Sequence, residues 1–537
     1  MTGGDAITAE LLAHGTDTVF GLPGAQLYGL FDAFHRARPQ LKVIGTRHEQ
    51  GAGYMAFGYA RSTGRPSVYA VVPGEGMLNA SAALATAQSA NAPVLCLTGQ
   101  VPTSFLDQGR GQLHEIPDQL ATMRSLVKWA ERISTPAEAP LLVATAFREL
   151  LSLRPGAAAL EMPWDVFTKR EAVTGIAPLP LRPEPEPDPA DIADAVRLLQ
   201  SSRTPMIFAG GGAFGASEEI LGLAELLDAP VVSYRSGRGI VSAGHPLQMV
   251  FSAAYKLWPT TDLVIAIGTR LEVPEWRWPS KPAGLKSIRI DIDPAEMQRF
   301  RADVAILASA KSGTRALLEA AQRAGTPSSG RREAIRQANV ETAREVREKL
   351  PQIAYLDVIR DVLPHHGILA DDLCQAGFAS WFAFPIYQPR TFLSAGYSGN
   401  LGAGFPSALG AKVAHPGTPV VSICGDGGFL FCGQELATAA QYGIAVVTIV
   451  FNNNAYGNVV RDQTLGFEGR VIASQLKNPD FVKLGEAYGV PSARARSPRE
   501  LRPLLEKALG DNQPWLIEVP VGPDDEASPW PWIMPNL

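Results

Sequence analysis

The chain has little cysteine. Four cysteines occur in 537 residues, and no two of them form a CxxC pair. Each lies in or beside an apolar stretch, which favours buried free thiols over a disulfide framework or a zinc site. These residues are Cys96, Cys374, Cys424 and Cys432.

The chain also lacks long apolar runs and basic blocks. Its longest candidate run, Ile444–Phe451, is far shorter than the roughly 20 residues that cross a bilayer. The N-terminus has no basic segment followed by an apolar one, so no secretory signal is expected. The net charge of −5 disfavours a general nucleic-acid binder. We therefore expect a cytoplasmic protein with neither a membrane nor a nucleic-acid partner.

Two breaks divide the sequence into blocks. Six prolines fall between Pro178 and Pro189, and proline does not fit inside helices or central strands. A second break at Ala324–Arg332 precedes a charged, helix-favouring run that ends at Leu350. A prior of about 150 residues per domain allows three to four domains. The predicted division is a first domain over 1–175, a linker over 176–189, a central domain over 190–325, a linker helix over 326–350 and a third domain over 351–537.

Each block alternates β-rich apolar runs with amphipathic helical stretches. Pro93–Thr98, Leu263–Ile267 and Val446–Phe451 are typical of the apolar runs. Continuous apolar strands that alternate with helices indicate parallel sheets covered on both faces. The predicted fold class is therefore α/β, with three domains that each hold a mainly parallel sheet covered by helices.

The segment Ser422–Asn458 carries the most informative motif. An apolar strand ends in Gly425-Asp426-Gly427-Gly428, and a second one ends in Asn452-Asn453-Asn454. In a parallel βαβ unit both strands end at the same edge of the sheet, so Asp426 and Asn453 should lie side by side. Their oxygens suit Mg²⁺ bound together with phosphate, and the glycines let backbone N–H groups approach a diphosphate. Turn chemistry alone, the alternative, explains either segment but not both together.

This pattern resembles the diphosphate–metal motif of thiamine-diphosphate enzymes, in which GDG is followed by a helix, a strand and NN. The chain looks most like acetolactate synthases and is also similar to benzaldehyde lyase and benzoylformate decarboxylase. The resemblance implies a pyrimidine-binding, a central dinucleotide-type and a diphosphate-binding domain, in that order. It also implies that Asp426, the Asn453 side chain and the Ala455 carbonyl bind Mg²⁺. The residues then expected to line thiamine diphosphate in the third domain are Gly399, Leu401, Gly425, Asp426, Gly427, Gly428, Asn453, Ala455, Tyr456, Gly457 and Asn458.

A second resemblance lies near the N-terminus. Residues 47–52, Arg-His-Glu-Gln-Gly-Ala, are similar to the RHEQGA segment of acetolactate synthases, whose glutamate hydrogen-bonds N1′ of the aminopyrimidine. This implies that Glu49 is catalytic and also binds the cofactor. A carboxyl group beside an apolar ring in a dry cleft has a raised pKa suited to proton exchange. The alternative is a helix-start glutamate favoured by the helix dipole. His48 is expected to be structural.

The glycine-rich segment Ser394–Pro406 resembles the family's turn into a helix. The resemblance implies that Gly399 offers its carbonyl to the cofactor's amino group and that Leu401 keeps the cofactor bent. Acetolactate synthases usually carry methionine at this second position, and related decarboxylases carry isoleucine or leucine. In the family the pyrimidine and diphosphate domains meet across a subunit interface. A homodimer is therefore the implied minimum, and a homotetramer the common assembly.

Three substrate-facing positions depart from the family pattern. Ala25 stands where pyruvate decarboxylases carry an acidic proton donor. His114 stands where acetolactate synthases carry glutamine, and Asp462 where they carry a tryptophan that shapes the second-substrate site. His114 is the expected catalytic proton shuttle, with a loop histidine bonded to Glu115 or solvent as the alternative. The expected substrate-facing residues are Ala25, Gln26, Leu113, His114 and Asp462.

The resemblance implies a thiamine-diphosphate- and Mg²⁺-dependent enzyme that makes or breaks a C–C bond next to a carbonyl. Decarboxylation or carboligation of a 2-oxo acid is the first expectation, and the partner is a small 2-oxo acid or 2-hydroxy ketone. One alternative is an acyloin or 2-hydroxyacyl lyase without net decarboxylation, and another is a catalytically silent nucleotide-binding regulatory protein. Gly210–Gly215 formally matches GxGxxG, a weak signal that leaves bound FAD, or an NAD- or flavin-linked oxidoreductase, as a further alternative.

The apolar segment Ser528–Pro535 either folds over the cleft or packs on the surface.

Overall fold

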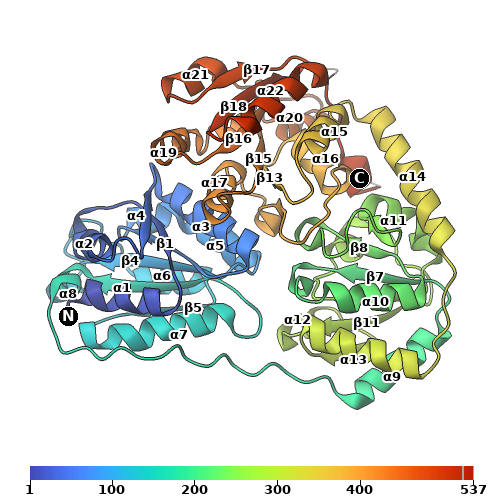
Figure 1. Ribbon diagram of the computed structural model, residues 1–537, viewed down its shortest axis with the longest axis horizontal. Helices are drawn as coiled ribbons and strands as arrows, with labels where there is room; N and C mark the ends of the chain where they lie inside the picture. The colour runs from blue at the N-terminus through green and yellow to red at the C-terminus, as the bar shows by residue number, and fades with distance from the viewer. Residues whose placement is uncertain (523–524, 536–537) are drawn as a thin grey trace.

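The computed structural model of the chain describes residues 1–522 and 525–535. Residues 523–524 and 536–537, which the sequence assigns to the third domain, lie outside the described part. Three six-stranded sheets follow one another along the chain, and the paired strands within each are parallel. The α/β prediction is therefore confirmed. In Figure 1 the first sheet lies in the blue and cyan part, the second in the green and yellow part, and the third in the orange and red part.

The first sheet has the strand order β2-β1-β3-β4-β6-β5. Its strands are β1 (Thr18–Gly21), β2 (Lys42–Gly45), β3 (Ser67–Val71), β4 (Val94–Gln100), β5 (Trp129–Arg132) and β6 (Ala158–Pro163). Its helices are α1 (Gly3–Ala13), α2 (Tyr28–Arg36), α3 (Glu49–Thr63), α4 (Glu75–Asn79), α5 (Ser81–Ser89), α6 (Gln119–Leu126), α7 (Ala139–Leu151) and α8 (Trp164–Thr168).

The central sheet has the order β9-β8-β7-β10-β11-β12, which is the strand order of dinucleotide-binding folds. Its strands are β7 (Pro205–Ala209), β8 (Val231–Ser233), β9 (Gln248–Val250), β10 (Leu263–Ile267), β11 (Lys286–Asp291) and β12 (Val304–Leu307). Its helices are α9 (Pro189–Ser201), α10 (Ser217–Leu227), α11 (Phe251–Leu257), α12 (Pro294–Arg299) and α13 (Ala310–Arg323).

The third sheet, ordered β14-β13-β15-β16-β18-β17, repeats the topology of the first. Its strands are β13 (Ile368–Asp371), β14 (Phe392–Leu393), β15 (Val420–Gly425), β16 (Val446–Asn452), β17 (Ser492–Arg494) and β18 (Trp515–Pro520). Its helices are α15 (Ile353–Val362), α16 (Gln375–Ala383), α17 (Gly404–Ala414), α18 (Asp426–Phe429), α19 (Leu436–Tyr442), α20 (Gly457–Gly466), α21 (Phe481–Ala487), α22 (Pro498–Gly510) and α23 (Trp530–Ile533).

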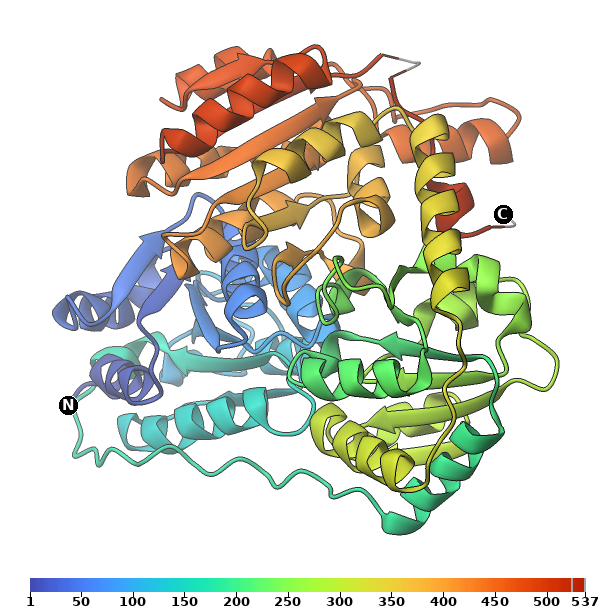
Figure 2. The ribbon, with the colours of Figure 1, turned by 45° about the vertical axis from the view of Figure 1, so that its right-hand side comes forward.

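Two connections join the domains. Residues 171–188 form neither helix nor strand and run along the lower edge of the molecule in Figures 1 and 2. α9 begins at Pro189, the last residue of the predicted linker, where proline needs no helical hydrogen bond and Asp188 caps the helix. Helix α14 (Arg332–Lys349) leads from the central domain up to the third.

The third domain shares a hydrophobic core with each of the other two. Its closest packing is α17 against α3, two helices that follow equivalent strands, β14 and β2. A Cβ atom added at Gly58 of α3 would overlap the Ser407 carbonyl of α17, and one added at Gly410 would overlap the Met55 carbonyl. The two helices therefore meet at backbone distance through a reciprocal pair of glycines.

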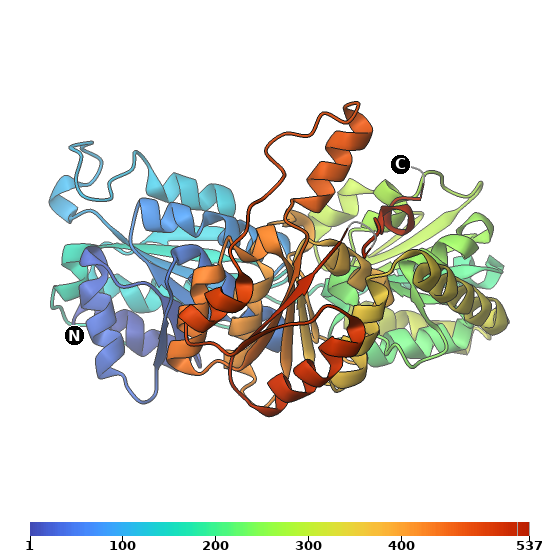
Figure 3. The same cartoon turned by 90° about the horizontal axis from the view of Figure 1, so that it is seen from above.

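One helix stands apart from this packing. α20 projects from the body of the molecule in Figure 3 and buries none of its residues. Leu465 and the following Phe467 and Ile472 are exposed. None of the helices in the described part of the chain has the length and apolarity that crossing a bilayer requires.

The glycine contact between α3 and α17 can be tested by substitution. Gly58→Ala should lower the free energy of unfolding by about 1–3 kcal/mol, because the added methyl group meets a backbone carbonyl that has no room to move. Urea unfolding followed by circular dichroism measures the change. The matched control is Gly175→Ala, where an added Cβ meets no atom within 4 Å. Equal stability of the two variants would contradict the close contact.

Candidate active site

The two strands of the Gly-Asp-Gly-Gly and Asn-Asn-Asn segments are neighbours in the third sheet. β15 and β16 pair in parallel with Gly425 opposite Phe451, so both chains leave the sheet at the same edge. The backbone N–H of Ala455 donates to Asp426 Oδ2 at 3.2 Å and to Asn453 Oδ1 at 3.0 Å. The structure therefore brings the three predicted metal ligands together.

These residues face a cavity of about 260 Å³ at the carboxyl edge of the sheet. Every third-domain residue predicted to line the cofactor lines this cavity, from Gly399 to Asn458. All of its lining residues lie between 373 and 526. The sequence did not point to seven of them: Leu373, Cys374, Gln375, Phe378, Phe451, Val459 and Glu526.

The Asp426 carboxylate is buried and is held by neutral donors. Burial raises the pKa of Asp426, while the Asn478 amide at 2.6 Å and the N–H groups of Gly427 and Ala455 stabilise its charged form. None of its partners in the described chain is a cation. A carboxylate, an amide oxygen and a carbonyl form a donor set that fits Mg²⁺, which completes its shell with phosphate and water.

Two side chains missed by the sequence analysis hold the metal-site residues in place. Glu526 Oε1 accepts from Asn453 Nδ2 at 2.6 Å, which turns the amide oxygen of Asn453 towards Ala455. Asn478 Nδ2 donates to Asp426 and, at 2.9 Å, to Asn452 Oδ1. Neither residue belongs to a motif, so no sequence signal could have found them.

Glu49 lies on the first domain, as the first residue of α3. The helix is capped by His48, whose Nδ1 accepts from the Gln50 N–H, so His48 has the structural role expected of it. Glu49 is only 9% exposed, and the Asn79 amide donates to its Oε2 at 3.2 Å. Glu435 of the third domain accepts from the backbone N–H groups of Arg47 and His48, both at 3.0 Å, and so anchors the turn that carries Glu49.

Four of the predicted substrate-facing residues gather near Glu49. Gln26 donates to the Leu113 carbonyl at 2.5 Å, and His114 Nδ1 lies 2.8 Å from Glu75 Oε2. The His114 ring therefore pairs with Glu75 rather than with Glu115. Glu75 and Asn79 both belong to α4, so this short helix contacts His114 with its first residue and Glu49 with its last. Ala25 precedes Gln26 in the same turn.

Asp462 lies just outside the cavity and away from Glu49. It sits on the projecting helix α20, where it bonds Asn458 and Arg461, and it does not line the cavity. The segment Ser528–Pro535 lies beside the cavity instead of elsewhere on the surface. The Trp530 indole donates to Asn458 Oδ1 at 2.5 Å and packs against Phe378, and both of these partners line the cavity.

Comparison with known proteins gives one consistent answer. The N-terminal TPP binding domain, central domain and C-terminal TPP binding domain of thiamine pyrophosphate enzymes match residues 1–122, 192–317 and 372–519. The chain is 34% identical to a probable acetolactate synthase large subunit of Methanocaldococcus jannaschii, over 97% of this chain and 92% of that one. It is 32% identical to a probable 2-ketoarginine decarboxylase of Pseudomonas aeruginosa, over 97% and 94%.

The chain belongs to the thiamine pyrophosphate enzyme family. It is therefore an enzyme of a thiamine-diphosphate-dependent class, and the resemblance drawn from its motifs is confirmed. An acetolactate synthase of Arthrospira platensis, 32% identical over 98% of this chain and 96% of that one, agrees.

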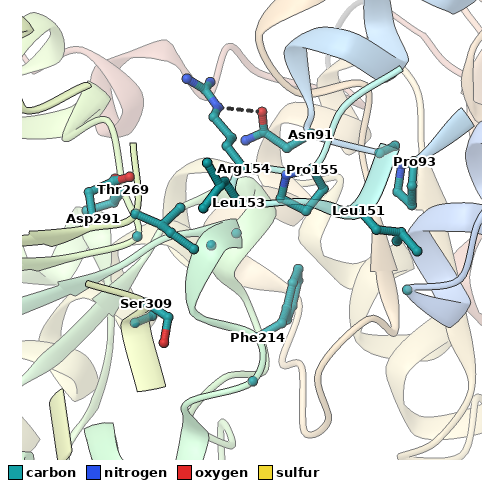
Figure 4. A pocket seen from close by; sticks show the side chains of 18 of the residues that line it. Asn91, Pro93, Leu151, Leu153, Arg154, Pro155, Phe214, Thr269, Asp291 and Ser309 are labelled. Atoms are coloured by element: carbon teal, nitrogen blue, oxygen red, sulfur yellow. Dashed lines mark hydrogen bonds between the residues drawn. The ribbon is translucent and has the colours of Figure 1, made fainter. Parts of the chain in front are cut away.

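The central domain of this family member has its own cavity, of about 300 Å³, at the border with the first domain. Figure 4 shows Arg154, which hydrogen-bonds Asn91, and Phe214 among its lining residues. In the Gly210–Gly215 loop, a Cβ added at Gly210 or Gly212 would meet the neighbouring Gly268, so these two glycines are needed for loop packing. Bound FAD stays the alternative that the sequence left open.

Two adjacent acids that the sequence analysis did not single out lie at the end of strand β13: Asp371 is its last residue and Asp372 follows it. Burial raises the pKa of Asp371 to about 7 and that of Asp372 to about 6. The Trp381 indole donates to Asp371 at 2.5 Å, and the N–H groups of Leu373 and Gly404 donate to Asp372. Asp372 thereby connects β13 to the start of α17 and lies beside Gly428 of the cavity.

The raised pKa of Asp371 predicts a pH effect on stability. Because the folded-state pKa lies above the ordinary value of 3.8, its stabilising contribution is full below about pH 4 and is lost as pH rises towards 7. Asp371→Asn should remove this loss, so the variant should gain about 2 kcal/mol relative to the natural chain between pH 5 and pH 7. Urea unfolding midpoints at pH 5 and at pH 7 measure this difference in stability. The exposed Asp361→Asn is the control, and parallel curves for all three proteins would refute the effect.

Proposed function

We propose that this enzyme uses thiamine diphosphate and Mg²⁺ to make or break a C–C bond next to a carbonyl, with decarboxylation of a 2-oxo acid as its first step. The observation that carries the proposal is the meeting of Asp426, Asn453 and Ala455 beside the glycine turn in one cavity. The names of its relatives, acetolactate synthase and 2-ketoarginine decarboxylase, support the same reaction class.

The third domain would hold the diphosphate end of the cofactor. Asp426, Asn453 and the Ala455 carbonyl would bind Mg²⁺, and the N–H groups of the glycine turn would face the phosphates. Asn478 and Glu526 would keep the two ligand side chains oriented, as partners of metal ligands commonly do. When bound, the thiazolium ring supplies an electron sink for the carbanion formed next to the carbonyl.

Glu49 would hold and move the proton at N1′ of the aminopyrimidine. The Asn79 amide occupies its Oε2, and no hydrogen-bond donor in the described part of the chain occupies its Oε1. The carboxyl group is nearly buried, an environment in which proton exchange with a bound ring competes little with water. Glu435 would act on the position of Glu49 only, through the backbone of the preceding turn.

Two copies of the chain would complete one site. Glu49 does not line the cavity that holds Asp426, so one chain presents the two halves of the site separately. Large apolar side chains are exposed beside each half: Phe431 at 47% and Val459 at 46% near the cavity, and Leu78 at 42% and Leu113 at 62% near Glu49. Such surfaces suit burial against a second copy. We infer a homodimer as the minimum, and a homotetramer as the assembly expected of the family.

His114 would hold or move the proton at the substrate carbonyl oxygen, with Glu75 fixing its ring. Ala25 stands where related decarboxylases carry an acidic proton donor, and alanine cannot donate a proton. This disfavours rapid release of an aldehyde and favours transfer to a second carbonyl compound. The absence of an acid at Ala25 also leaves an acyloin or 2-hydroxyacyl lyase as the second candidate. Retention of Glu49, Asp426 and Asn453 argues against a silent regulatory protein.

The role proposed for Glu49 predicts that its substitution slows the reaction without preventing cofactor binding. Glu49→Gln should slow turnover by about 10²–10⁴-fold, because the amide cannot exchange the proton, while thiamine diphosphate still binds in the presence of Mg²⁺. Steady-state rates and calorimetric titration of the cofactor measure the two effects. Glu218→Gln, at the start of α10 and also a helix-start glutamate, is the control. Undiminished turnover by Glu49→Gln would rule out the role.

The reaction class can be settled by assaying pyruvate, benzoylformate, 2-ketoarginine and benzoin side by side. We expect at least one of the three 2-oxo acids to release CO₂ and yield an aldehyde or a 2-hydroxy ketone, and a chelator of Mg²⁺ to stop the release. Cleavage of benzoin without CO₂ release from any 2-oxo acid would instead favour the lyase. Mass spectrometry of the products and manometry of CO₂ give the answer.

A further inference from the structure

A second cavity, of about 650 Å³, lies away from the catalytic one. It opens between the segment 238–252 of the central domain, helix α14 and the end of α16, elements that lie side by side on the right of Figures 1 and 2. Its volume falls within the range of small-molecule sites, roughly 300–1,000 Å³. The reaction proposed above makes no use of it.

An arginine lies at the base of this cavity. Arg238 is 6% exposed and lines the cavity, and its guanidinium donates to the carbonyls of Ser380 and Phe384 at the end of α16. A guanidinium has five N–H donors, and no carboxylate in the described part of the chain pairs with this one. Burial lowers the pKa of Arg238 to about 9, and the charge of Asp371 offsets this only in part.

Two buried hydroxyl groups line the same cavity without a partner. Ser252 and Thr342 are 7% and 2% exposed, and neither hydroxyl oxygen has a hydrogen-bond partner in the described part of the chain. Burying a hydroxyl without a partner is costly, so such groups usually have a ligand or water. The remaining wall is largely apolar and includes Val250, Val346, Ile353, Phe382 and Phe384.

We propose that this cavity binds a small monocarboxylate with an apolar chain, its carboxylate at Arg238 and its chain along the apolar wall. Charge favours this class over a cation, because Glu333 is the one acidic residue among the lining residues, and Arg336 already pairs with it. Ser252 and Thr342 add two polar residues to the same lining.

Helix α16 connects the two cavities. Its first turn, with Gln375 and Phe378, lines the catalytic cavity, and its last residues, Phe382 and Ala383, line the second one. The helix is nine residues long, which is about 13 Å. Because Arg238 is bonded to the end of this helix, a carboxylate at Arg238 changes the hydrogen bonds that hold α16. Binding should therefore alter the affinity for thiamine diphosphate, and the cofactor should alter carboxylate affinity by the same factor.

The test uses octanoate as the probe on the enzyme loaded with thiamine diphosphate and Mg²⁺. Calorimetry should show saturable binding of one octanoate per chain. Octan-1-ol, which lacks the carboxylate, should bind about tenfold or more weakly, as loss of hydrogen bonds to a charged group implies. Ala343→Phe, which fills the cavity from α14, should abolish binding, whereas Ala334→Phe on the exposed face of the same helix should not. A repeat with 3-methylbutanoate distinguishes a short branched acid from a longer chain.

Four outcomes would overturn the proposal. The first is no saturable binding of either acid, and the second is binding that survives Ala343→Phe. The third is competition between octanoate and thiamine diphosphate for one site, which would place the acid in the catalytic cavity. Sedimentation of Ala343→Phe and Ala334→Phe shows whether the cavity is covered by a second copy; a change of assembly confined to Ala343→Phe would also overturn it. These results do not depend on which reaction the enzyme catalyses.

Discussion

Helices α3 and α17 pack so closely that two glycines, Gly58 and Gly410, are in contact with the backbone of the opposite helix. This contact determines where both halves of the site lie. α3 begins at Glu49, and α17 begins shortly after Gly399 and Leu401, so a shift of one helix against the other would displace Glu49 relative to the cavity that these two residues line. Glu435 adds a polar connection across the same boundary through its bonds to the turn before Glu49.

Buried carboxylates of the third domain, at or near the Asp426 cavity and at the turn before Glu49, are held by N–H and hydroxyl donors rather than by paired cations. Asp372, Asp426 and Glu435 all follow this pattern. Each charge is stabilised by fixed dipoles, which keeps cationic side chains out of a space that a divalent metal and a diphosphate are proposed to occupy. Burial raises the pKa values of these three groups, and the hydrogen bonds to their charged forms offset that increase only in part.

Much of the fold and of the cofactor cavity could be predicted from the sequence, because both follow from local patterns. The glycine turn and the asparagine run each end an apolar strand, and parallel pairing brings such ends together. Strand β6 is harder to predict because it carries a buried glutamate, Glu161, whose partners are distant in sequence: Arg132, Gln119 and Gln100. Asn478, Glu526 and Arg238 were missed for the same reason: their partners are set by tertiary packing, which no spacing encodes.

The contact between α3 and α17 joins segments that are made far apart in time. Gly58 and Gly410 are separated by both the rest of the first domain and the whole central domain. At about 5–20 residues per second, a ribosome needs roughly 20–70 seconds to travel between them. Throughout that interval the nascent first domain presents the apolar face of α3 uncovered. The first domain therefore emerges from the ribosome with an apolar surface that is covered only after the third domain has been made.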